Sequence, residues 1–265
     1  MREYEDNPAG RLRTLLIELH GTPPNTPAWE RVAALLVPTD TPSSPAALRA
    51  MTRLLELPSD IRTAVEALDE DEEEKEHLVE HLDKVEAFLT SVANRNANLG
   101  QALQSTFAAG GDIPNSAAVQ SLSTCSRRLH RYSPEPVIPR EEIDELIQSV
   151  TALMNDIRAS SLDGAAKGLL LHHLYRLLQA LDLIRITGAA PVEESLDALI
   201  GAVSRNPEAM QDARRQGFAE RLAAIANTVK TVFDIARGIR QFGTEAHGAI
   251  EQGTHAIEQA SHLLS

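Results

Sequence analysis

Cysteine is nearly absent, since the chain of 265 residues contains only Cys125. A single thiol excludes an intrachain disulfide and a zinc site built on cysteines. Aromatic residues make up 3% of the chain, which argues against aromatic cages and base-stacking platforms. The sequence shows no apolar signal-peptide core, and no apolar window approaches the roughly 18 residues of a membrane-spanning helix. We therefore expect a folded protein of the cytoplasm.

Charge is unevenly distributed along the chain, whose net charge is −13 at pH 7. This balance argues against nucleic acid as a partner, because neutralising phosphates requires a basic surface. Residues 60–86 hold twelve acidic and three basic side chains, whereas residues 214–240 hold six basic and two acidic ones. The two segments are either solvated faces that pair loosely with each other or docking sites for charged partners.

The spacing of apolar residues predicts the fold class. No segment shows the alternation of β-branched and polar residues that is typical of strands. Apolar residues recur instead at intervals of three and four, which predicts an all-α multi-helix bundle with long antiparallel helices and a long heptad-patterned helix at its carboxyl end. Between Leu78 and Leu103 this spacing has one gap, at Asn96, which is either a polar seam position or part of a local bend.

Prolines and changes in composition divide the chain into five segments. Residues 1–58 hold eight of the fourteen prolines and are predicted to form short helices, near 27–37 and 45–57, around a buried Trp29. The other four segments are a helical region with an acidic helix (59–132), a rigid linker (133–140), a central helical bundle module (141–205) and a long amphipathic C-terminal helix (206–265). Gly188 is predicted to end a helix and Pro191 to begin the next.

The last segment has the most regular pattern. From Phe218 to Leu264, apolar or small residues alternate at spacings of four and three, and a helix with that seam would be about 70 Å long at roughly 1.5 Å per residue. Its glycine-rich second half is marginal in isolation and is expected to lie against another surface. The large seam residues predicted to contact a partner are Phe218, Leu222, Ile225, Val229, Val232, Ile239, Ile250, Ile257 and Leu264. The basic residues predicted to set orientation and partner choice are Arg214, Arg215, Arg221, Arg237 and Arg240.

One short motif resembles a metal site. Residues 77–81 read His-Leu-Val-Glu-His, the H-x-x-E-H pattern in which two histidines one helical turn apart bind zinc and the glutamate acts as a base. His77 and His81 are therefore candidate zinc ligands of a metalloprotease. The surrounding helix is rich in glutamate, so a solvated acidic face with a chance match is the preferred interpretation.

A second motif has the spacing of a thiolate phosphatase. Cys125 and Arg131 match C-x5-R, a chemistry that needs a loop of backbone N–H groups around the phosphate between a strand and a helix. Here no strand precedes the motif and no glycine lies in it. A small buried cysteine followed by an exposed basic turn is the preferred interpretation. Because no phosphate-binding loop, dinucleotide fingerprint, nucleophile elbow or kinase signature occurs either, we predict neither catalytic residues nor a cofactor.

Residues 141–203 carry the only resemblance to known proteins. Their pattern, with Ser161-Leu162, Lys167, Leu170, Leu174, Leu177, Ala180, Ile186, Gly188 and Leu196 as its elements, resembles one found in a family of uncharacterised all-helical bacterial proteins. The resemblance covers about a quarter of the chain. It implies an all-helical module and no particular reaction.

Two hypotheses for function follow. In the first, the protein is a non-enzymatic helical scaffold or adaptor, and its C-terminal helix associates with a second copy or with another protein. In the second, it is a membrane-acting effector, for example in bacterial defence, whose basic amphipathic segment 214–242 binds an anionic membrane surface. Oligomeric state with and without the C-terminal helix tests the first hypothesis, and binding to anionic liposomes tests the second.

Overall fold

The computed structural model describes residues 4–20, 25–37, 41–94, 97–107 and 113–237. In these ranges the regular secondary structure is helical, apart from an isolated bridge between Pro27 and Asn98. The predicted all-α fold is therefore confirmed. Buried apolar side chains form two clusters, one built mainly from residues 9–129 and the other from residues 138–233. We refer to residues 4–132 as the N-terminal module and residues 140–237 as the C-terminal module.

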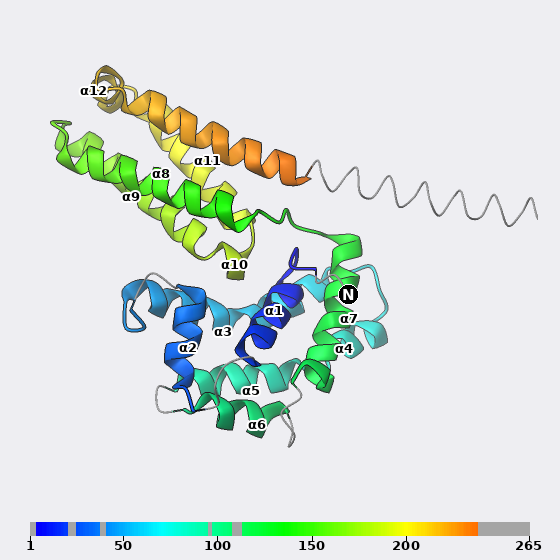
Figure 1. The fold of residues 1–265 in the computed structure, drawn as a ribbon. Coiled ribbons are helices and arrows are strands. Elements are labelled where there is room, and N and C mark those ends of the chain that lie inside the picture. The colour runs from blue at the N-terminus through cyan, green and yellow to red at the C-terminus, as the bar shows by residue number, and fades with distance from the viewer. Residues whose placement is uncertain (1–3, 21–24, 38–40, 95–96, 108–112, 238–265) are drawn as a thin grey trace, which may run out of the picture.

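The N-terminal module surrounds its first helix (Figure 1). Leu12, Leu16 and Leu19 of this helix are fully shielded from solvent. The helix packs mainly against α7 and α3. Trp29 is buried in the same core, as predicted, and its indole N–H donates to the Pro42 carbonyl. The elements of this module are α1 (Pro8–His20), α2 (Ala28–Leu36), α3 (Pro45–Glu66), α4 (Glu72–Val79), α5 (Leu82–Ala93), α6 (Leu99–Phe107), the 3-10 turn η1 (Ile113–Asn115) and α7 (Ala117–Tyr132).

Helix α3 crosses the expected boundary between residues 58 and 59. It begins where the sequence indicates, with the Ser44 hydroxyl accepting from the Ala47 N–H and Pro45 in the first turn. It then continues through Pro58 to Glu66 instead of ending near residue 57. Leu54, Leu57 and Ile61, on both sides of the proline, are almost fully buried. Burying this stripe offsets the roughly 3 kcal/mol that an interior proline costs. Residues 1–58 and 59–132 accordingly share one core.

The region between Leu78 and Leu103 consists of three helices. Helix α4 ends at Val79, α5 covers Leu82–Ala93 and α6 begins at Leu99. The apolar residues of the predicted spacing are still all buried. Helix α5 ends at Ala93, and the Asn98 side chain accepts from the Gln101 N–H at the start of α6. Asn96 itself lies outside the described residues.

The C-terminal module is a helical bundle joined to the first module by the extended residues 133–139 (Figure 1). Its helices are α8 (Arg140–Ala159), α9 (Gly164–Asp182), α10 (Ile184–Thr187), α11 (Ala190–Arg205), α12 (Ala209–Arg215) and a helix over residues 218–237. The predicted linker and the predicted stop at Gly188, whose φ is +75°, are both present. Arg221 pairs with Asp156 near the end of α8, and Arg237 pairs with Glu193 near the start of α11. Helix 218–237 thus runs opposite to both.

The expected single helix over 206–265 is interrupted. Helix α12 ends at Arg215, and Gly217 adopts φ +77° before a new helix begins at Phe218. The turn separates two burial sites, because Met210 and Ala213 of α12 are fully buried and helix 218–237 packs along the bundle. A straight helix cannot satisfy both contacts. Residues 238–265 lie outside the described residues, and with them Ile239, Arg240, Ile250, Ile257 and Leu264.

Candidate functional site

The seam residues predicted to contact a partner lie in this chain's own core as far as the structure describes them. Phe218, Leu222, Ile225 and Val229 are buried among α8, α9 and α11 residues, and Val232 is partly buried against the same cluster. Phe233, outside the predicted seam, is almost fully buried. The pattern therefore identified a buried face, but the first half of that face is covered by the C-terminal module itself. The same packing removes this apolar face from any membrane surface while the bundle stays closed.

Those of the predicted basic residues that the structure describes, which leaves out Arg240, lie on the outside of the C-terminal module. Arg214 and Arg215 are exposed at the end of α12. The Arg221 guanidinium lies 2.7 Å from the Asp156 carboxylate, and Arg237 pairs with Glu193 and Asp234. These carboxylates belong to the same module and not to the acidic segment 60–86. Exposed pairs of this kind contribute about 0–1 kcal/mol each, so they orient the helix more than they stabilise it.

The H-x-x-E-H motif lies across a helix break. Glu80 follows the last residue of α4, and His81 precedes the first residue of α5 with φ −103° and ψ 8°. His77 and His81 are therefore not one turn apart on a continuous helix, which is the geometry that the zinc motif requires. The His77 imidazole lies 3.4 Å from the Glu80 carboxylate at the exposed surface. Among the described residues, no group of three or more histidine, cysteine, aspartate or glutamate side chains is placed to hold a metal ion.

Cys125 occupies the middle of α7 and is fully buried. Burial raises the pKa of its thiol from 9.0 to about 12, so the thiol stays protonated and unreactive at neutral pH. Arg131 lies six residues later on the same continuous helix and is exposed. The arrangement contains no loop of backbone N–H groups around a phosphate and agrees with the interpretation of a structural cysteine.

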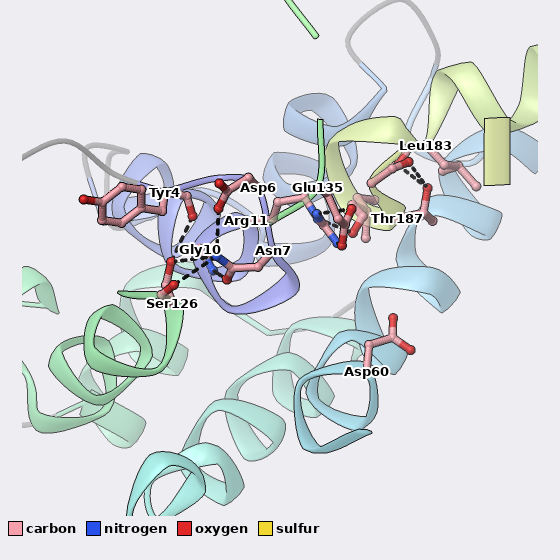
Figure 2. Close-up of polar contacts among 12 residues, drawn as sticks. Tyr4, Asp6, Asn7, Gly10, Arg11, Asp60, Ser126, Glu135, Leu183 and Thr187 are labelled. Carbon is pink, nitrogen blue, oxygen red and sulfur yellow. Dashed lines mark hydrogen bonds and ion pairs between the residues drawn. The ribbon is translucent and has the colours of Figure 1, made fainter. Parts of the chain in front are cut away.

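A buried polar cluster that was not predicted from the sequence lies at the beginning of α1, as Figure 2 shows. Asp6, Asn7 and Ser126 are each at most 4% exposed. The Asn7 amide group donates to the Asp6 carboxylate, the Ser126 carbonyl and the Ser126 hydroxyl, and its oxygen accepts from the Gly10 N–H at 2.9 Å. Asn7 therefore caps α1. Asn7-Pro8 carries the same capping signal as Ser44-Pro45, so the sequence could have identified this helix start.

The same cluster connects to the end of α7 and to the linker. The Asp6 carboxylate lies 2.5 Å from the His130 ring nitrogen Nδ1, and Tyr4 stacks on that ring with the centroids 3.9 Å apart. The Asp6 backbone carbonyl accepts from the Glu135 N–H at 2.7 Å. The segment before α1 thus joins α7 to the first residues of the linker.

Arg11 is the central polar residue of the junction between the modules (Figure 2). Its guanidinium donates to both carboxylate oxygens of Glu135, at 2.9 and 3.2 Å, and to the Ile186 carbonyl at 3.0 Å. Arg11 belongs to α1, Glu135 to the linker and Ile186 to α10, so three segments meet at one side chain. Its side chain is only 8% exposed. Sequence spacing offers no signal for this contact, because its partners lie 124 and 175 residues away.

Two hollows border this junction. One, of about 80 Å³, is lined by residues that include Arg11, Val137 and Gly188, and a wider groove of about 370 Å³ includes Arg140 and Ile147. Some residues line both hollows, and they come from the two modules and from the linker: Glu5, Leu36, Ile138, Ile143, Ile184 and Arg185. The modules are therefore in contact without being tightly packed along their whole boundary.

Comparison with models of protein families, with curated proteins and with solved structures finds no match to this chain. The resemblance of residues 141–203 to a helical bacterial family gains no support from these comparisons. Within the described ranges, no helix has an apolar stretch long enough to cross a bilayer.

Proposed function

We propose that the protein is a non-enzymatic helical scaffold that associates with a second copy of itself through residues 239–264. The observation that supports the proposal most strongly is that the chain's own helices bury the first part of the apolar seam, while the seam pattern continues beyond that part. From Phe218 to Val229 its large side chains are buried against the C-terminal module's own helices, and Val232 is partly buried there. The spacing of four and three continues in the sequence through Ile250, Ile257 and Leu264.

The composition of the continuing segment supports association between helices. Its seam alternates the large residues Ile250 and Ile257 with the small residues Gly243, Ala246, Gly253 and Ala260. Small seam residues permit close approach of two helix backbones, whereas the same glycines weaken an isolated helix by about 1 kcal/mol each. Pairing with a second chain supplies the burial that such a segment needs. A different protein with a matching seam is the alternative partner.

The test compares the molar mass of the full chain with that of a chain ending at residue 237, by light scattering during size-exclusion chromatography. A cut at residue 237 retains Phe218 through Phe233, whereas a cut at residue 205 would remove part of the core. We expect the full chain to exceed its monomer mass of 28.8 kDa and the shortened chain to be a monomer. Ile250→Asp with Ile257→Asp in the full chain should also give a monomer, because two buried charges disrupt the seam.

Equal helix content and equal unfolding midpoints of the three proteins serve as the control for folding. A full chain that remains a monomer at about 100 μM, a concentration far above a typical micromolar Kd, contradicts self-association. A shortened chain with the same higher mass contradicts the assignment to residues 239–264. Binding of the full chain to anionic liposomes at low salt would favour the membrane hypothesis instead.

A further inference from the structure

The connection between the two modules depends on very few elements. One extended segment, residues 133–139, links them along the chain. The helix contacts between them run mainly through the short α10, which lies against α1 and α3. Ile186 of α10 is 2% exposed and belongs to the apolar core of the N-terminal module. Modules joined in this way move relative to each other unless specific contacts hold them.

Arg11 holds both of these connections at once. Its two terminal guanidinium nitrogens donate to the Glu135 carboxylate on the linker, and its Nε–H donates to the Ile186 carbonyl on α10. Gly188 completes the site, because a Cβ atom added there would lie 1.8 Å from the Glu135 carboxylate and 2.9 Å from the Arg11 guanidinium. Its φ of +75° is also the left-handed conformation that favours glycine. The missing side chain at Gly188 therefore leaves the space that this ion pair occupies.

Burial makes the ion pair between Arg11 and Glu135 unfavourable to separate. The Arg11 side chain is 8% exposed and that of Glu135 29%, so separating them would leave a buried guanidinium without its carboxylate, which is strongly unfavourable. The ion pair of Arg185 with Glu18, which joins the two modules directly, has side chains that are 40% and 37% exposed. Water and salt screen that pair far more. The Arg11 ion pair is thus better shielded from water than the pair of Arg185 with Glu18.

The space beside Arg11 leaves room for movement. The hollow of about 80 Å³ lies between α1, the linker and the start of α11. The groove of about 370 Å³ continues it along α8. Tight apolar packing, which would fix the two modules without polar contacts, is interrupted at these places.

We propose that Arg11, Glu135 and the Ile186 carbonyl form a latch that holds the two modules in one closed arrangement, with residues 133–139 as the hinge. When the latch is broken, the modules move apart about this linker and the groove that they share opens. The latch is a property of the chain itself and does not depend on the proposed self-association.

Single-molecule energy transfer in the full chain tests the latch, with dyes at Leu55→Cys on α3 and Ile200→Cys on α11. Both positions are exposed, while the native Cys125 is buried and does not compete for label. Samples at picomolar concentration contain only monomers, so self-association does not enter. We expect one narrow distribution of transfer efficiency for the otherwise unchanged chain and a broader distribution at lower efficiency for Arg11→Ala.

Arg62→Ala is the matched control, because Arg62 also pairs with two carboxylates, Asp83 and Glu86, but within the N-terminal module. It should leave the distribution unchanged. Glu135→Gln keeps the arginine and removes one charge, so it should broaden the distribution in the same direction even where Arg11→Ala folds poorly. Circular dichroism confirms that each variant keeps its helices. A narrow, unshifted distribution for Glu135→Gln, or equal broadening by Arg62→Ala, would overturn the proposal.

Discussion

At the scale of single residues, burial decides what each polar side chain does in this protein. Asn7 is nearly inaccessible, yet its amide nitrogen donates to Ser126 of α7 and its amide oxygen accepts from the Gly10 N–H at the start of α1. His77 and Glu80, in contrast, are exposed and pair with each other at the surface. The H-x-x-E-H match, for which a solvated acidic face is the preferred interpretation, thus lies at the exposed surface, while Asn7 joins the start of α1 to α7 in the interior. A buried amide left without hydrogen-bond partners costs about 1–3 kcal/mol, which explains why the buried Asn7 side chain is hydrogen-bonded.

Cys125 leads to a prediction about alkaline pH. The pKa of its thiol rises from 9.0 to about 12 through burial. Above pH 9 the unfolded chain loses this proton and the folded chain keeps it, so the group's contribution to stability falls as pH rises, by about 1.4 kcal/mol per pH unit. Urea unfolding at pH 8 to 10.5 should show the native chain losing stability faster than Cys125→Ala. The comparison cancels the lysines and tyrosines that both proteins share, and parallel curves would contradict the assignment.

At the scale of elements, burial of apolar side chains decides where a helix continues or ends more than local helix propensity does. Helix α3 continues through Pro58, whereas the apparently continuous seam is broken at Gly217. In both cases the core decides, because each outcome places apolar side chains on the inside. Local rules predicted the cap at Ser44 and the helix start beside Pro191 correctly, since both depend on neighbours within three or four residues.

Gly217→Ala distinguishes a broken helix from a continuous one by the sign of its effect. At φ +77°, with no atom within 4 Å of an added Cβ, alanine brings strain without a clash and should destabilise the chain by about 1 kcal/mol. In a continuous helix the same change would stabilise by about 0.5–1 kcal/mol. Gly168→Ala is the matched control, because Gly168 is exposed inside α9 with equally open space. Denaturant unfolding should therefore show opposite signs for the two variants.

At the scale of the whole molecule, helix 218–237 is a structural part of the C-terminal module. Removing its apolar side chains would open the core formed by α8, α9 and α11. This requirement separates the roles of the two halves of the seam. The first half stabilises the fold, and the second half, residues 239–264, carries the proposed association.

A pair of neighbouring substitutions measures this structural role. Phe233 is 1% exposed and Ile235 is 54% exposed on the same helix. Phe233→Ala should lower the free energy of unfolding by about 3–5 kcal/mol, and Ile235→Ala by less than about 0.5 kcal/mol. Both values come from urea unfolding followed by circular dichroism, using the chain that ends at residue 237 so that association does not contribute. Similar losses for the two variants would show that this helix does not pack as described.

The sequence by itself determined the fold class, the linker at 133–139, the stops and starts at Gly188 and Pro191, and which residues along each helix are apolar. All of these depend on periodicity or on contacts within a few residues of the chain. The tertiary structure alone decided that Pro58 stays inside a helix, that Phe218 to Val229 face their own bundle, and that Arg11 meets Glu135 and Ile186. These outcomes depend on groups more than a hundred residues apart or on burial summed over several helices, which a local pattern does not contain.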